Sequence, residues 1–240
     1  MLLIMCTLLC YIYRAGIYYK AGQSKNLNFE SYPNEGMRTE ENMKNLFKSP
    51  RGLTFLGLML AITIIMDLTP LGMIPLGVIS LTITHIPTII TGIVLGPVAG
   101  LIMGTSFGII SLLHALTRPA TPLDPLFINP LLSVLPRMFI GVVAYFVYLL
   151  ISKLFKKQTL INSVTTFIGG VAGSLTNTGL VFLMLYLIYA QKVVELMGTT
   201  VGAIFISVFT TNAIAEAVLS GLITMPVALA YFRYNNTKKA

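Results

Sequence analysis

Long apolar runs separated by short polar segments make up most of the chain from residue 53 onward. A helix needs about 20 residues to cross a bilayer. Six runs are suited to this by length and apolarity: residues 53–68, 79–95, 98–116, 130–150, 161–189 and 201–232. Residues 79–116 are divided in two because a single helix of that length would reach about 57 Å and Gly96-Pro97 predicts a turn. The pattern therefore predicts an all-α integral membrane protein, a six-transmembrane-helix bundle.

Composition and charge agree with this fold class. Hydrophobic residues make up 55% of the chain and charged residues only 10%, and the mean hydropathy is +0.84. With the N-terminus inside, the cytoplasmic segments hold most of the basic residues: Lys44, Lys48, Arg51, Lys153, Lys156, Lys157, Arg233, Lys238 and Lys239. The outer loops hold Arg118 and Lys192. This bias predicts cytoplasmic termini and explains the net charge of +8 without nucleic acid as a partner.

Three regions follow from the composition. Residues 1–50 are expected to form a flexible extension, in which Met37 and Met43 offer alternative translation starts. Residues 51–234 form the six-helix membrane domain, and residues 235–240 a basic cytoplasmic tail. Cys6 and Cys10 both lie in the extension, so the membrane domain has no cysteine metal site or disulfide.

One arginine, Arg137, interrupts an apolar run. A charge at bilayer depth costs about 2.5 kcal/mol or more, so a partner, cavity or ligand must compensate for it. A four-residue repeat predicts that the polar side of this helix faces a cavity. Its members are Asn129, Ser133, Arg137, Gly141 and Tyr145.

Further polar groups occur in the last two runs, where Asn177 follows Gly173 by four residues. Asn212, Glu216 and Ser220 repeat every four residues in the last run. We expect these groups to meet Arg137 in one cavity and Glu216 to be within reach of an ion pair with it. Arg137 then either binds a ligand or only braces Glu216. The candidate substrate-binding residues are Arg137, Asn129, Asn177, Asn212, Glu216, Ser133 and Arg118.

Two Pro-rich segments, residues 69–77 and 117–125, are short and partly apolar, and we expect them to cap the cavity. Arg118 lies in the second. It either adds positive charge at the entrance or remains solvated among headgroups.

The sequence offers little support for an enzyme. No Walker-type loop occurs, the serines lack an obvious base in sequence, and His85 and His114 lack a metal-ligand spacing, so we predict no catalytic residue, metal or cofactor. A solute-binding membrane subunit is the leading hypothesis. A membrane enzyme using Arg137 and Glu216 on a lipid or isoprenoid is the second, and a passive scaffold or channel is the third.

Small residues at four-residue intervals predict where helices touch. The longest series is Gly92, Gly96, Gly100, Gly104 and Gly108. In the first run, Gly57 and Ala61 offer a small-residue groove that a partner subunit can occupy.

Several of these segments occur together: Leu95-Gly-Pro-Val-Ala-Gly100, Leu135-Pro-Arg137, Thr176-Asn-Thr178, and Asn212 with Glu216. Over residues 53–232 the chain resembles the substrate-binding S components of energy-coupling factor (ECF) vitamin transporters. The resemblance implies a vitamin-binding subunit that works with a transmembrane coupling subunit and two cytoplasmic ATPases. Gly57 and Ala61 match the family's docking motif on the first helix, with glycine in place of the usual first alanine.

Among substrates, residues 79–87 and 127–137 look most similar to pantothenate-specific members. Pantothenate is a small anion with a carboxylate, an amide and two hydroxyls, which suits one arginine with several asparagines. Folate and riboflavin remain alternatives because Tyr and Phe can provide stacking surfaces in a chain without Trp.

Overall fold

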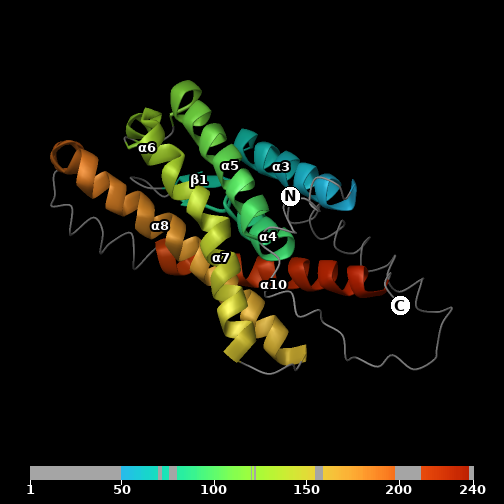
Figure 1. Cartoon of the computed structure of the whole chain (residues 1–240). Helices are drawn as coiled ribbons and strands as arrows, with labels where there is room; N and C mark the ends of the chain where they lie inside the picture. The colour runs from blue at the N-terminus through green and yellow to red at the C-terminus, as the bar shows by residue number, and fades with distance from the viewer. Residues whose placement is uncertain are drawn as a thin grey trace.

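The structure is a computed structural model, and it describes residues 50–69, 72–75, 80–119, 121, 123–154, 159–197 and 212–237 (Figure 1). The elements are α3 (Pro50–Leu68), β1 (Met73–Pro75), β2 (Ser80–Thr82), α4 (Ile86–Leu95), α5 (Pro97–Thr117), the 3₁₀ helix η1 (Asp124–Ile128), α6 (Pro130–Ser133), α7 (Leu135–Leu154), α8 (Thr159–Met197) and α10 (Ile214–Thr237). Residues 1–49 of the predicted extension and the last three residues of the predicted tail lie outside the described residues.

Five helices in the described residues are long and apolar enough to cross a membrane. They cover Pro50–Leu68, Pro97–Thr117, Pro130–Leu154, Asn162–Glu195 and Ile214–Tyr234. Figure 1 shows α7 in yellow passing through the middle of the bundle, and its main neighbours are α5 and α8. A helical membrane bundle is therefore confirmed.

The second predicted span differs from the expected helix. Ser80–Thr82 is a strand that pairs antiparallel with Met73–Pro75, and α4 begins only at Ile86. Pro87 lies in the first turn of α4, where the missing N–H costs nothing. With 10 residues, α4 is about 15 Å long, half of a bilayer core. The expected turn at Gly96-Pro97 is confirmed, since Gly96 has a φ of 100° and Pro97 begins α5.

The fourth predicted span is interrupted at one point, although Pro130–Leu154 as a whole still counts as one candidate span. Pro130 begins the short helix α6, Val134 is a turn, and Pro136 lies in the first turn of α7. Because Pro136 lacks the amide hydrogen that would donate to the Leu132 carbonyl, the helical hydrogen-bond ladder is interrupted just before Arg137. Asn129 precedes α6 as its N-cap, so the predicted four-residue stripe does not lie wholly on a helix.

The last two predicted spans are largely helical. α8 is broken at Tyr189, where φ is −128° and ψ is 23°, and the fifth predicted span also ends at this residue. α10 follows a short π-helical turn at Asn212 and Ala213, while residues 201–211 of the sixth predicted span lie outside the described residues.

The predicted glycine contacts are confirmed between α4, α5 and α7. A Cβ atom on Gly92 would collide with the carbonyl oxygen of Gly141, and one on Gly104 would collide with that of Arg137. A Cβ atom on Gly100 would lie 2.8 Å from the carbonyl carbon of Gly141. These glycines therefore let the backbone of α7 rest directly on α4 and α5, which fixes the depth of Arg137 in the bundle.

A buried histidine ties α4 to α8 and α10. Nε2 of His85 lies 3.1 Å from Oγ of Ser174 and 2.9 Å from Oγ of Ser220, and all three residues are fully buried. Hydrogen bonds between membrane helices contribute about 1 kcal/mol each. His85 is thus a structural contact that positions the short helix.

Candidate functional site

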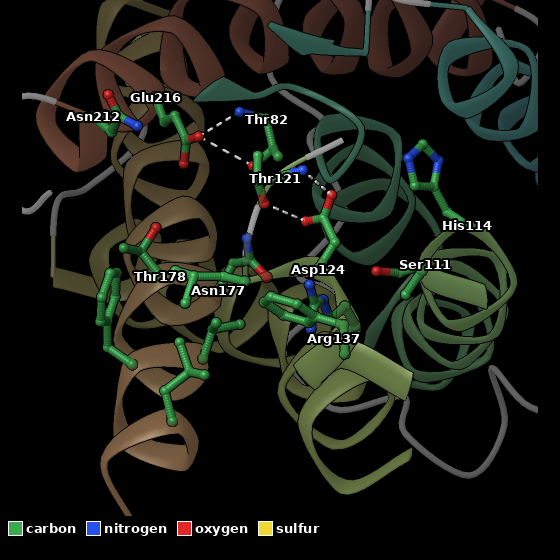
Figure 2. Close-up of a pocket in the computed structure, with 16 residues that line it drawn as sticks. Thr82, Ser111, His114, Thr121, Asp124, Arg137, Asn177, Thr178, Asn212 and Glu216 are labelled. Carbon is green, nitrogen blue, oxygen red and sulfur yellow. Dashed lines mark hydrogen bonds between the residues drawn. The ribbon is translucent and has the colours of Figure 1, made fainter. Parts of the chain in front are cut away.

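A cavity of about 130 Å³ lies between the helices and beneath the loop that precedes α4 (Figure 2). It is lined by 16 residues: Thr82, Ser111, His114, Ala115, Thr121, Leu123, Asp124, Phe127, Arg137, Asn177, Thr178, Val181, Phe182, Leu185, Asn212 and Glu216. The structure thus brings together four predicted site residues, namely Arg137, Asn177, Asn212 and Glu216.

Arg137 is positioned by the break between α6 and α7. In a continuous helix the amide of residue 136 would donate to the carbonyl of residue 132. Pro136 has no amide hydrogen, and Nη1 of Arg137 donates to the Leu132 carbonyl instead, at 2.6 Å. The proline therefore leaves an acceptor that holds one edge of the guanidinium.

Two aromatic rings hold the guanidinium group from its faces. Its central carbon lies 4.8 Å from the ring centroid of Phe127 and 5.9 Å from that of Phe107. Both distances fall in the range of cation–π attraction, which stabilises a desolvated cation by about 2 kcal/mol. Arg137 is 8% exposed, so its charge is almost completely withdrawn from solvent.

Glu216 does not pair with Arg137, contrary to the expected ion pair. The Glu216 carboxylate accepts hydrogen bonds from the backbone N–H of Thr82, at 2.5 Å, and from the Thr82 hydroxyl, at 3.0 Å. The reason is tertiary: β2 brings Thr82 over the start of α10, and its donors occupy the carboxylate. Within the described residues, no carboxylate oxygen lies within 4 Å of the Arg137 guanidinium.

Besides Nδ1 of His114, which faces the Asp67 carboxylate, two lining groups are buried without a hydrogen-bond partner among the described residues. One is the donor Nε of Arg137, and the other is the acceptor Oδ1 of Asn177. An unpaired buried polar group costs about 1–3 kcal/mol, so each of these two is suited to a ligand atom. The pair predicts a ligand with both an acceptor and a donor.

The second Pro-rich segment borders the cavity, as expected of a cap. Asp124 is 7% exposed, and its carboxylate accepts from the backbone N–H and the hydroxyl of Thr121, both at 2.7 Å. These contacts close the segment into a compact turn over the cavity. Thr82 follows the first Pro-rich segment, much of which lies outside the described residues.

Three predicted site residues do not line the cavity. Asn129 caps α6 by accepting from the Leu131 amide at 3.0 Å, and its amide nitrogen donates to the Tyr189 hydroxyl. Ser133 donates to the Phe127 carbonyl. Arg118 lies 3.6 Å from the Asp67 carboxylate and is partly exposed. Asn129 and Ser133 are thus occupied by local partners at the start of the helix.

Sequence reasoning missed several polar lining residues, among them His114, Ser111 and Asp124. Ser111 and His114 are three residues apart on α5, a spacing that places both on one side of a helix. That signal was present in the sequence. No sequence signal marked Asp124 as a lining residue, because its placement depends on how the loop folds back over the helices.

The cavity also has an apolar wall, formed by Leu123, Phe127, Val181, Phe182 and Leu185. These residues belong to one buried cluster that joins η1 to α8. A cavity with one buried cation, several amide and hydroxyl groups and an apolar wall suits a small amphipathic anion. In the described part of the chain, no three His, Cys, Asp or Glu residues are grouped to hold a metal ion.

Within the described part of the chain, one face of α3 has no neighbouring element. Gly57 and Ala61 are exposed, and a Cβ atom added to Gly57 would meet nothing within 4 Å. Exposed apolar residues continue this face along the helix, as at Leu53, Ile64 and Leu68. The predicted partner groove is therefore open in the structure.

A helical bundle that crosses the membrane and encloses a polar cavity with a buried cation defines a membrane protein that binds a small solute. The chain belongs to the family of substrate-specific components of ECF transporters, whose sequence model matches residues 51–228. Members are the substrate-binding subunits of transporters in the cell membrane and not enzymes, so the hypothesis of an enzyme acting on a lipid is wrong.

A relative with an assigned activity is the pantothenic acid transporter PanT of Lactococcus lactis subsp. cremoris (strain MG1363). It is 27% identical over 169 residues, which cover 65% of this chain and 79% of the relative. The match and the family together make this chain a multi-pass protein of the cell membrane that serves vitamin uptake.

Proposed function

We propose that this S component captures pantothenate from outside the cell and that Arg137 binds its carboxylate. The observation that carries the proposal is a buried guanidinium with a free donor and, among the described residues, no carboxylate within 4 Å. An uncompensated buried charge is strongly unfavourable, so an anionic ligand stabilises it. The planar fork of arginine suits the two oxygens of a carboxylate.

The rest of the cavity supports the same ligand. Asn177, Asn212 and Thr178 supply amide and hydroxyl groups that match the amide and hydroxyls of pantothenate. The apolar wall suits its two geminal methyl groups. The relative named as a pantothenic acid transporter adds independent support.

Folate and riboflavin carry large ring systems, and the cavity suits them less well. A ring ligand needs an accessible aromatic face, and the lining rings are Phe127 and Phe182. One face of Phe127 already lies against the Arg137 guanidinium. A cavity of about 130 Å³ also favours a small ligand.

We further propose that α3 docks on a transmembrane coupling subunit. This subunit couples ATP hydrolysis by two cytoplasmic ATPases to transport by this chain. The open face around Gly57 and Ala61 supports this, because small residues let two helices approach closely. The chain has no Walker-type loop of its own, so ATP hydrolysis falls to the partners.

In this proposal the chain has six membrane elements, with both termini in the cytoplasm. The five long helices supply five of them, and the half-length helix α4 with the β1–β2 ladder supplies the sixth. The basic residues around Lys153 and Arg233 then lie on the cytoplasmic side.

The test is a comparison of two ligands, pantothenate and its alcohol analogue, in which the carboxylate is reduced. Arg137→Lys keeps the charge but loses the planar fork, so we expect pantothenate binding to weaken by about tenfold or more. Arg137→Met is expected to weaken pantothenate binding much more than binding of the alcohol. Isothermal titration of purified protein in detergent measures both dissociation constants.

Three results would oppose the proposal. Equal losses for both ligands would make Arg137 a structural residue. Alternatively, Arg137→Met combined with Glu216→Gln could restore wild-type stability and affinity together, which is the behaviour of a brace. Failure of the wild-type protein to bind pantothenate, with saturable binding of another vitamin, would assign that vitamin instead.

A further inference from the structure

A group of three polar side chains joins the end of α3 to the wall of the cavity. Asp67 of α3 is 7% exposed, and its Oδ1 lies 3.2 Å from Nδ1 of His114 on α5. Its Oδ2 lies 3.6 Å from Nη2 of Arg118. His114 lines the cavity, whereas Asp67 and Arg118 do not. The carboxylate thus lies behind a histidine whose other side borders the cavity.

The contact with Asp67 fixes which side of the imidazole ring faces the cavity. The Asp67 carboxylate is close to Nδ1 but does not meet the angular requirement of a regular hydrogen bond, so the contact is electrostatic. In Figure 2 one ring nitrogen points toward the side of Thr121 and Asp124, and the other points away. Among the described residues, the polar contact of the His114 ring is the one between Nδ1 and Asp67. In polar sites a carboxylate or carbonyl group usually lies against one ring nitrogen of a histidine. This contact orients the other nitrogen toward the group that it binds.

The other charged groups in the cavity already have partners, which leaves Nε2 of His114 available to the ligand. The carboxylates of Asp124 and Glu216 are held by Thr121 and Thr82, and Arg137 is assigned to the ligand carboxylate. His114 stands on α5, and Arg137 on α7, so the two can contact different parts of one ligand.

We propose that His114 is a specificity-determining residue that hydrogen-bonds a hydroxyl group of the ligand through Nε2, and that Asp67 is the residue that positions it. This inference rests on the proposed function, since it assigns the uncharged end of the same anion. It predicts that the site selects hydroxyl-bearing carboxylates over those without the hydroxyl. The contact between Asp67 and His114 also connects α3 to the cavity in which the ligand would bind.

The experiment measures dissociation constants for pantothenate and for two analogues, each lacking one of its hydroxyl groups. His114→Phe keeps a flat ring without the nitrogens, and we expect it to bind pantothenate about tenfold more weakly than wild type. For the analogue that lacks the contacted hydroxyl, wild type and His114→Phe should bind equally. His114→Leu replaces His114→Phe if that variant does not purify in folded form.

Asp67 is tested by its own pair of variants. Asp67→Asn keeps an acceptor near Nδ1 and should retain most of the affinity. Asp67→Leu should weaken pantothenate binding to the level of His114→Phe, with no further loss in the double variant. Arg118→Gln is the matched control, because it removes the other partner of Asp67 without altering a lining residue, and it should bind like wild type.

The inference is overturned if His114→Phe binds pantothenate like wild type, or if it weakens pantothenate and both analogues by the same factor. The second result would indicate a packing effect. Either result would leave the assignment of the carboxylate to Arg137 intact, provided that Arg137→Met still weakens the binding of pantothenate more than that of the alcohol analogue. A wild-type protein without pantothenate binding would refute the proposed function itself.

Discussion

At the scale of single residues, Arg137 depends on the residue beside it. Pro136 cannot donate to the Leu132 carbonyl, and the Arg137 guanidinium takes that acceptor at 2.6 Å. Buried acceptors are almost always satisfied, so this contact stabilises the carbonyl as well as the side chain. Pro136 therefore helps to orient the Arg137 guanidinium before a ligand binds.

We expect Pro136→Ala to weaken pantothenate binding by about tenfold, because the new amide competes for the Leu132 carbonyl and releases one edge of the guanidinium. Affinity for the alcohol analogue should change little. Pro130→Ala is the control: Pro130 occupies the first turn of α6, where the missing amide hydrogen has no helical acceptor. Titration calorimetry on both variants measures the effect, and unchanged pantothenate affinity in Pro136→Ala would contradict it.

At the scale of elements, glycines serve two different purposes in this bundle. Gly92, Gly100 and Gly104 are covered by the backbone of α7, so they are needed for folding. Gly57 on α3 and Gly179 on α8 are exposed, and a Cβ atom on either would meet nothing within 4 Å. A larger side chain at these two positions therefore fits within this chain.

We predict that Gly57→Leu with Ala61→Leu leaves pantothenate affinity and melting temperature unchanged but strongly reduces assembly with the coupling subunit, and uptake with it. The reason is that leucine keeps a partner helix from approaching the α3 backbone. Gly179→Leu is the matched control, since it adds the same side chain to an equally open glycine on another helix. Co-purification and vitamin uptake by cells measure the result, and normal assembly of the double variant would place the docking face elsewhere.

At the scale of the whole molecule, every residue that lines the cavity lies between Thr82 and Glu216. The family match likewise begins only at residue 51. Among the described residues, the lining groups of the proposed binding site therefore all belong to the membrane domain.

A chain that begins at Met43 should therefore insert into the membrane and bind pantothenate with the affinity of the full chain. Saturating pantothenate should raise the melting temperatures of both chains by the same amount, because the ligand stabilises only the folded state. Thermal denaturation in detergent with and without ligand provides the measurement. Lost binding in the shorter chain would show that the extension contributes to the site.

Most helices could be predicted because apolar length is a local property. The runs that begin near residues 53 and 98 became α3 and α5 within a few residues of the expected bounds. The run at 79–95 became a strand followed by a short helix, because strand pairing with Met73–Pro75 and the proline at position 87 override apolarity there. Periodicity also did not anticipate that the proline at position 136 would interrupt the helical hydrogen bonds of the next run.

The candidate site was predicted in part. Arg137, Asn177, Asn212 and Glu216 were recognisable as polar groups in apolar runs, and all four line the cavity. Asn129 and Ser133 were assigned to it by helical spacing, which failed once the helix was interrupted.

The sequence by itself determined that the chain is a helical membrane protein with a charge to be compensated in its interior, because burial cost and apolar length depend only on residue types. The tertiary structure alone decided which groups compensate one another. Thr82 reaches Glu216 across 134 positions of sequence, and Asp67 of α3 reaches His114 of α5. Such contacts depend on how loops return and how closely helices pack, and no local pattern encodes them.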